Sequence, residues 1–307
     1  DTSQSSTSDR VSFPSSFSIT GNGGIVIDTP GNIIEIHNAS YKGGTEVIRG
    51  TLSIPTGGAL NGTANIILGR GSNTAHLTNY GSINSGELRI YNNSTANNHG
   101  VLEINKASSY ITNYGMLLNQ ASASINIADT KTTSGKILDY GPFNYGYTYN
   151  KGSIEARHFF NSDKPLKGSL NHKLSYYKKY LQNNIQLPAI VHNSVQGTIT
   201  TRGNFENKGL VINEGIIQSN ELSNRKNAIV SISGAKARIK SDILNSGLIT
   251  GTGTVQGDLY NEGTTAPGNS IGTLTVDGNY IQGLTNPNAN LNIEVDGSTS
   301  DLLKITG

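Results

Sequence analysis

Residues 261–278 read Asn-Glu-Gly-Thr-Thr-Ala-Pro-Gly-Asn-Ser-Ile-Gly-Thr-Leu-Thr-Val-Asp-Gly. Near the end of this stretch Leu274 and Val276 alternate with polar residues, so one face is apolar and the other is polar, as in a half-buried strand. The preceding Pro267-Gly268-Asn269 fixes one φ angle and then tolerates left-handed backbone, which favours a sharp turn. The stretch therefore predicts two short strands separated by a tight turn.

The same alternation recurs from Ile19 onward, where aliphatic residues two positions apart mark short strands with one buried face. The pairs are Ile25 and Ile27, Ile34 and Ile36, Leu52 and Ile54, Ile66 and Leu68, Leu88 and Ile90, Leu102 and Ile104, and Ile125 and Ile127. Between the strands an Asn-x-Gly sequence occurs eleven times, beginning at Asn22, Asn79, Asn84, Asn98, Asn113, Asn144, Asn150, Asn207, Asn213, Asn245 and Asn261. The chain is thus an internal repeat with irregular spacing.

Irregular repeats of short strands and Gly/Asn turns are typical of a β-solenoid, in which each coil stacks only on its neighbours. At about 20 residues per coil we expect roughly a dozen coils, and a rise of about 4.8 Å per coil gives a rod on the order of 60 Å long. Its core is predicted to be stacked Ile, Leu and Val, with Asn at the corners. A β-sandwich needs longer antiparallel strands.

The composition fits this all-β class. The 307 residues include 37 Gly, 37 Asn and no Cys, which supplies turns and removes disulfides and thiolate chemistry. Disorder is the alternative, because only 34% of residues are hydrophobic, but the regular alternation argues against it. We expect a soluble, mature chain, since no apolar run approaches the roughly 20 residues that span a bilayer and no signal peptide opens the sequence.

The net charge of +2 is too small to indicate general attraction to nucleic acid or membranes. Residues 1–18 are rich in serine and are predicted to be a flexible leader or an irregular cap. Residues 19–307 are predicted to form a single β-helix domain. An irregular insertion at about 140–194 interrupts this domain.

Half of the twenty Phe and Tyr residues lie between Tyr140 and Tyr180, and residues 157–192 carry six Lys or Arg against one acidic residue. Ser169 is a candidate N-cap for a short amphipathic helix whose Leu170, Leu174, Tyr177 and Leu181 recur at helical spacing. This basic, aromatic insertion is either a flap that covers the solenoid flank or a recognition loop on a rigid scaffold. The candidate binding residues are Arg157, Phe159, Phe160, Lys173, Tyr176, Lys178, Lys179 and Tyr180.

The end of the chain resembles the passenger repeat of Gram-negative type V autotransporters. The matching segments are Ala-Pro-Gly-Asn-Ser-Ile-Gly-Thr-Leu-Thr-Val-Asp-Gly-Asn-Tyr at 266–280, Leu-Asn-Ile-Glu-Val at 291–295 and Ser-Asp-Leu-Leu-Lys-Ile-Thr-Gly at 300–307. The resemblance implies a right-handed parallel β-helix passenger, exported through the periplasm by a C-terminal translocator barrel that this sequence does not include. The passenger would be secreted or displayed on the outer membrane. The insertion departs from a plain passenger.

Motifs for catalysis are weak. Ser270 sits in a Gly-x-Ser-x-Gly sequence, but a nucleophile elbow needs a helix after it and here a strand is predicted. The six histidines show no short metal-ligand spacing, and no phosphate-binding loop occurs. Asp28, Glu35 and Glu46 fall in successive early coils, where they form either a carboxylate stack or a solvated face. We expect no metal and no cofactor.

These observations predict a non-enzymatic passenger, an adhesin or a released virulence factor and signalling ligand, that binds a host-cell surface protein receptor or an acidic glycan. One alternative is a β-helix enzyme acting on polysaccharides, which needs clustered carboxylates or an Arg or Lys base on one face. Another is a passenger that self-associates and aggregates cells. Adhesion and receptor activation stay open, as do the host partner, the release of the passenger and its oligomeric state.

Overall fold

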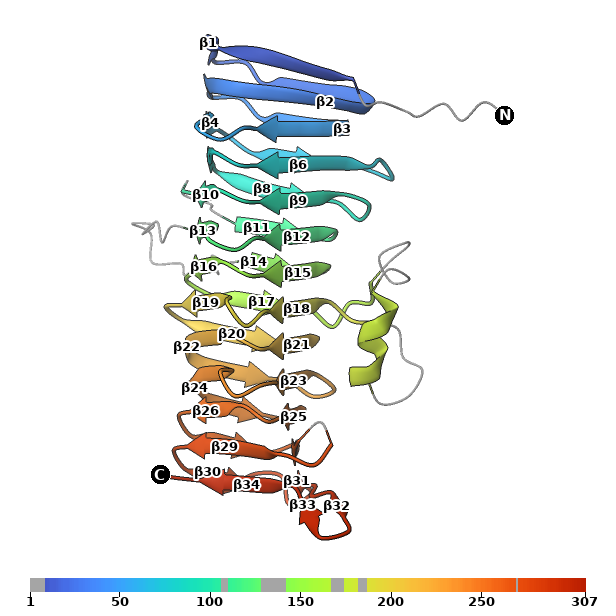
Figure 1. Ribbon diagram of the computed structural model, residues 1–307, viewed down its shortest axis with the longest axis vertical. Helices are drawn as coiled ribbons and strands as arrows, with labels where there is room; N and C mark the ends of the chain where they lie inside the picture. Colours follow the sequence, from blue (N-terminus) through green and yellow to red (C-terminus); the bar gives the residue numbers. More distant parts are fainter. Residues whose placement is uncertain (1–8, 106–109, 128–141, 167–173, 182–186, 269) are drawn as a thin grey trace, which may run out of the picture.

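A computed structural model describes residues 9–105, 110–127, 142–166, 174–181, 187–268 and 270–307. The chain is an all-β, right-handed parallel β-solenoid of about 11 turns (Figure 1). The N-terminal coils lie at one end of the rod and the C-terminal coils at the other. The fold class and the approximate number of coils predicted from the sequence are confirmed.

Each regular coil contributes one strand to each of three faces, here named A, B and C, and strands on a face pair in parallel with the coils above and below. Face A contains β4 (Ala59–Thr63), β7 (Ser82–Ser85), β10 (Val101–Ile104), β13 (Ser124–Ile127), β16 (Ser153–Ala156), β19 (Thr198–Thr201), the first parts of β22 (Ile216–Asn224) and β24 (Arg238–Asn245), β26 (Thr254–Gln256), β29 (Thr273–Asp277) and β34 (Leu302–Ile305).

Face B contains β5 (Ile66–Leu68), β8 (Glu87–Ile90), β11 (Tyr110–Asn113), β14 (Pro142–Asn144), β17 (Phe159–Asn161), β20 (Asn204–Asn207), the second parts of β22 and β24, β27 (Leu259–Asn261) and β30 (Tyr280–Gln282). Face C contains β6 (Ala75–Asn79), β9 (Thr95–Asn98), β12 (Met116–Asn119), β15 (Tyr147–Asn150), β18 (Ile190–Asn193), β21 (Leu210–Asn213), β23 (Ile229–Ile232), β25 (Leu248–Gly251), β28 (Thr264–Pro267) and β31 (Asn290–Leu291).

The two ends of the rod depart from this plan. Near the N-terminus the long, bent strands β1 (Arg10–Gly21), β2 (Ile25–Tyr41) and β3 (Thr45–Ile54) each pass through more than one face. Residues 10–18, predicted to be a leader or a cap, belong to β1, which pairs with β2, so they are a strand and not a flexible leader. Near the C-terminus β32 (Val295–Asp296) and β33 (Thr299–Ser300) form a small antiparallel hairpin.

The core is a set of aliphatic columns, because the same inward position is aliphatic in successive coils. On face A one column is in register and fully buried from coil to coil, and it consists of Ile83, Leu102, Ile125, Ile154, Ile199, Ile217, Ile239, Val255 and Val276. Burying such side chains contributes about 1.5–3 kcal/mol each. The predicted aliphatic pairs of residues 52–127 lie in this core.

Two ladders of buried asparagines close the ends of faces B and C. Each Nδ2 donates to the Oδ1 of the asparagine in the next coil at 2.7–3.0 Å. The face C ladder is Asn79, Asn98, Asn119, Asn150, Asn193 and Asn213, and the face B ladder is Asn113, Asn144, Asn161, Asn207, Asn224, Asn245 and Asn261. Nine of these thirteen residues begin an Asn-x-Gly sequence, so the repeated motif is a ladder motif.

The glycine of the motif is required by close packing between coils. A Cβ on Gly146 would lie 2.3 Å from the backbone oxygen of Gly115, and a Cβ on Gly152 would lie 2.1 Å from that of Ala123. Real Cβ atoms do not approach an oxygen this closely, so any side chain here would push adjacent coils apart. The motif therefore does more than form the predicted turn: its asparagine joins a ladder and its glycine lets adjacent coils pack closely.

We predict that Asn207→Ala destabilises the solenoid by about 2–4 kcal/mol, because the change leaves buried amide and carbonyl groups without partners. Asn207 donates to Asn224 and to the Ile229 carbonyl, and it accepts from Asn161 and from the Gly209 amide. Chemical denaturation followed by circular dichroism measures the loss. The control is Asn220→Ala at an exposed position, for which we expect a change within about 0.5 kcal/mol; equal effects of the two substitutions would contradict a stabilising ladder.

Candidate functional site

The insertion is shorter than predicted. Residues 142–161 and 190–193 form the ordinary coil strands β14 to β18, so the irregular segment runs from 162 to 189. Its two ends approach one another at an isolated bridge between Pro165 and Pro188. The aromatic run does not show the usual strand pattern, because Tyr147 and Tyr149 occupy outward positions of β15, whereas Thr148 and Asn150 fill the inward ones.

The predicted amphipathic helix is a short 3₁₀ helix, η1 (Ser175–Tyr180), beside face C (Figure 1). Its N-cap is Leu174, which makes no side-chain cap, and the predicted cap Ser169 lies outside the described residues, as does Leu170. Leu174 and Tyr177 are buried and Leu181 packs against them, in a second apolar cluster with Leu166, Leu187, Ile190, Leu210 and Ile212. The apolar face predicted from the spacing of residues 174, 177 and 181 is therefore confirmed, and it fixes the insertion to the flank.

A polar chain crosses this second cluster. The Tyr147 and Tyr177 hydroxyls are 2.9 Å apart, and Tyr177 Oη is 2.6 Å from Nδ1 of His192. His192 Nε2 lies 3.3 Å from Glu214 Oε2, although its geometry is not that of a regular hydrogen bond. Burial lowers the pKa of His192 while Glu214 opposes this shift, so the neutral ring, with Nδ1 accepting from Tyr177, is favoured.

We predict that acid loosens the insertion. The pKa of His192 is lowered in the folded chain, so its contribution to stability is present above the unfolded value of about 6.5 and is lost as pH falls below it. Protonation also removes the acceptor for Tyr177. Limited proteolysis of the insertion is expected to accelerate below about pH 6 in the wild type, whereas the non-titrating His192→Gln variant should show a much flatter pH profile. Identical profiles would assign the acid response to other groups.

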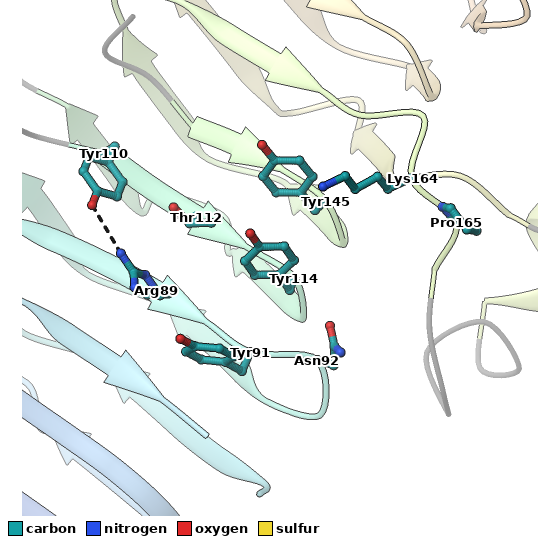
Figure 2. Close-up of a pocket in the computed structure, with 9 residues that line it drawn as sticks. All are labelled: Arg89, Tyr91, Asn92, Tyr110, Thr112, Tyr114, Tyr145, Lys164 and Pro165. Carbon is teal, nitrogen blue, oxygen red and sulfur yellow. Dashed lines mark hydrogen bonds between the residues drawn. The ribbon is translucent and has the colours of Figure 1, made fainter. Parts of the chain in front are cut away.

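The candidate site is a cavity of about 680 Å³ beside Lys164 and Pro165, the residues here called the root of the insertion (Figure 2). It lies along the outer side of face B and the corner that leads to face C. The lining residues are Arg89, Tyr91, Asn92, Tyr110, Thr112, Tyr114, Tyr145, Lys164 and Pro165. This volume falls within the range of roughly 300–1,000 Å³ that is usual for ligand sites.

A column of tyrosines forms one wall of the cavity. Tyr114 and Tyr145 each directly follow an asparagine of the face B ladder, and Tyr91 occupies the same corner one coil earlier, after Ile90. The ring centroids of Tyr91 and Tyr114 are 6.3 Å apart, and those of Tyr114 and Tyr145 are 4.9 Å apart, with nearly parallel planes. The Phe160 ring lies 6.2 Å from that of Tyr145, but Phe160 is opposite Phe143 in the register of β14 and β17, one position before the ladder asparagine, so it lies beside the column. The ladder therefore sets the spacing of the column.

The lining of the cavity contains two basic side chains, Arg89 and Lys164. Arg89 donates to the Tyr110 hydroxyl at 3.2 Å and is paired with Glu87 at 2.5 Å, so its orientation is fixed. Lys164, from the root of the insertion, places Nζ 4.9 Å from the ring centroid of Tyr145. None of the nine lining residues is acidic. Burial, with a smaller contribution from Tyr114, raises the pKa of Tyr145, so this hydroxyl is a hydrogen-bond donor at neutral pH.

The predicted binding residues do not form one site. Phe159 is 1% exposed and stacks on Phe205 at 4.7 Å inside the solenoid, so its prediction as a surface contact is wrong. Phe160 points outward beside the tyrosine column, with Lys208 5.1 Å from its ring. Lys178 and Lys179 are exposed on η1. Lys173 lies outside the described residues, and so do the side chains of Tyr176 and Tyr180.

Arg157 lines a different, smaller cavity of about 300 Å³ with Arg202, Glu103 and Glu155. Glu103 and Glu155 occupy one column of face A with Asn126 between them. Their backbones are two coil steps apart, about 10 Å. Glu103 and Glu155 are the candidate carboxylate pair for the alternative hypothesis of a polysaccharide-cleaving enzyme.

The three early carboxylates do not form a catalytic stack. Glu35 pairs with Arg10, Asp28 with Arg49 at 2.5 Å and Glu46 with Arg70 at 3.2 Å. Within the part of the chain that the structure describes, no three His, Asp or Glu side chains are arranged to hold a metal ion. The same part contains no helix long and apolar enough to cross a membrane.

No model of a known protein family matches the chain, and neither a curated protein nor a solved structure matches it. The resemblance to autotransporter passengers stays a prediction that depends on residues 261–307. The geometry of the cavity and of the insertion beside it is therefore the basis for a functional proposal.

Proposed function

We propose that this chain is the passenger of a Gram-negative autotransporter, exported through the periplasm and displayed on or released from the cell surface, where it binds a host-cell surface molecule. The tyrosine-lined cavity at the root of the insertion is the binding site. The observation that carries the proposal is the combination of Arg89, Lys164 and four tyrosines in one open cavity without an acidic lining residue.

The architecture suits binding. The floor of the cavity consists of paired strands, so it is rigid, while Lys164 and Pro165 come from the root of an irregular segment fixed by Leu166 and its apolar cluster. Loops on rigid scaffolds are common carriers of recognition. Tyrosine gives large contact area at low entropic cost, and basic side chains attract acidic partners. The insertion is then one wall of the site, whereas the sequence alone suggested that it was the whole site.

The chemistry of the cavity favours binding over catalysis. A general base must be deprotonated near the working pH, but burial raises the pKa of Tyr145 and Arg89 stays charged beside Glu87. The lining contains neither a carboxylate nor an imidazole. We therefore propose a non-enzymatic role and assign the competing enzymatic hypothesis to Glu103 and Glu155 of the smaller cavity.

Binding of the purified chain to cultured host cells tests the proposal. We predict saturable binding that Lys164→Glu weakens about tenfold or more, because the new carboxylate repels an acidic partner inside the cavity. Lys164 is exposed, and its charge reversal leaves the core intact. Lys240→Glu, on exposed face A, is the matched control and should bind like the wild type.

A double variant, Lys178→Glu with Lys179→Glu, separates the cavity from the outer side of η1. Unchanged binding by this variant would place the contact in the cavity. Loss of binding in the double variant but not in Lys164→Glu would instead favour η1. If the wild type binds no cells but the bacteria or coated beads aggregate, self-association replaces the proposal.

A further inference from the structure

The orientation of the tyrosine rings limits what the cavity can bind. Tyr114 and Tyr145 stack with an interplanar angle of 12° and Tyr91 lies beyond Tyr114 at 28°, so the ring faces that point along the column are turned toward neighbouring rings. Figure 2 shows their hydroxyls pointing to the same side, away from Lys164 and toward the strand that carries Thr112. The column therefore offers a row of hydroxyls and ring edges, with little free ring face.

This geometry argues against two classes of ligand. Single-stranded nucleic acids bind by stacking bases on free aromatic faces, and here those faces stack on one another. An extended peptide binds by adding a strand to an open sheet edge, but β8 and β11 are paired on both sides, with β5, β11 and β14. Recognition must therefore come from side-chain donors and charges.

The donors match an acidic sugar chain. Hydroxyls, an amide, a guanidinium and an ammonium group line the cavity, and they suit carboxylate or sulfate groups and sugar hydroxyls. The site extends along the solenoid axis from the coil of Arg89 and Tyr91 to the coil of Tyr145, and Lys164 follows β17 in the coil after that. Successive coils are about 4.8 Å apart and the tyrosine ring centroids are 6.3 and 4.9 Å apart, spacings comparable with the length of one pyranose unit of a polysaccharide.

We propose that the cavity binds a segment of acidic polysaccharide, rich in uronate or sulfate, lying along the rod axis. Arg89 and Lys164 contact anionic groups near the two ends of the segment, and the hydroxyls of Tyr114 and Tyr145 donate hydrogen bonds between them. This assignment rests on the proposed function, and it names the ligand class of the same site. Lys164 and Tyr145 are its specificity-determining residues.

Isothermal titration calorimetry with three size-matched probes tests the assignment: a heparin hexasaccharide, a galacturonate hexamer and maltohexaose. We expect the heparin hexasaccharide to bind, with affinity that falls as salt rises, and maltohexaose not to bind. Binding of the galacturonate hexamer as well would mean that carboxylates suffice, and its failure would assign the site to sulfate. Equal affinity for maltohexaose would overturn the assignment.

Two conservative variants locate the contact. Lys164→Gln is expected to weaken heparin binding about tenfold, and Tyr145→Phe, which keeps the stacked ring, about threefold to tenfold. The controls are Lys240→Gln and Tyr260→Phe, which lie away from the cavity. Heparin binding that neither test variant changes would overturn the assignment.

Different results would contradict the proposed function and the assigned ligand class. If Lys164→Glu abolishes cell binding but neither acidic probe binds the wild type, the proposed function stands and the ligand class is wrong, with a protein receptor in its place. If the galacturonate hexamer yields products that absorb as unsaturated uronates, the non-enzymatic function is wrong, and the ligand class of the tyrosine-lined cavity is then decided by the binding of the Lys164→Gln and Tyr145→Phe variants.

Discussion

The amide ladder between coils is the interaction on which the other features of this solenoid depend. At each corner of a coil, where a short strand ends, backbone N–H and C=O groups are left without a partner in the strand. Where the corner is buried, these groups need other hydrogen-bond partners. Each ladder asparagine except the last of its ladder donates one N–H to the next asparagine and the other to a backbone carbonyl of the following coil, as Asn150 does to Asn193 and to the Thr198 carbonyl. The side chain thus keeps adjacent coils in register where the strands stop.

The same register builds the candidate site. A residue that follows a ladder asparagine has no space inside and must point outward, so residues at this position form a column down the rod. Along face B the residues that follow successive ladder asparagines are Tyr114, Tyr145, Ser162, Lys208 and Arg225. The tyrosines and the basic residues of this column lie on either side of the insertion's root. The chain thus obtains a recognition surface while every coil keeps the same strand plan.

Much of the fold was predictable from the sequence, because the alternation of aliphatic residues and the Asn-x-Gly motif are local signals. The site was not, since it depends on which coil lies beside which. Consecutive ladder asparagines are separated by as few as 16 residues, from Asn245 to Asn261, and by as many as 46, from Asn161 to Asn207. With such variable coils, nothing in the chain shows that Arg89 and Lys164 line one cavity. The sequence Asn-Tyr-Gly at 113–115 and 144–146 was the one available signal for the tyrosine column.

The prediction that Phe159 of the aromatic insertion is a surface contact was wrong for a different reason. Its Tyr and Phe residues read as one binding surface, but strand alternation divides them between inside and outside, so that Phe159 enters the core while Phe160 faces solvent. A concentration of aromatic residues predicts burial as readily as it predicts recognition. Only the register of β17 against β20, with Phe159 opposite Phe205, distinguishes the two.

The most direct test of this account is a crystal structure of the chain with a bound acidic hexasaccharide. The account predicts a sugar chain parallel to the rod axis, with anionic groups beside Lys164 and Arg89 and with the Tyr114 and Tyr145 hydroxyls donating to it. A hexasaccharide lying across the axis, on η1 alone or in the cavity of Glu103 and Glu155 would contradict the claim that the ladder-spaced tyrosine column is the recognition surface.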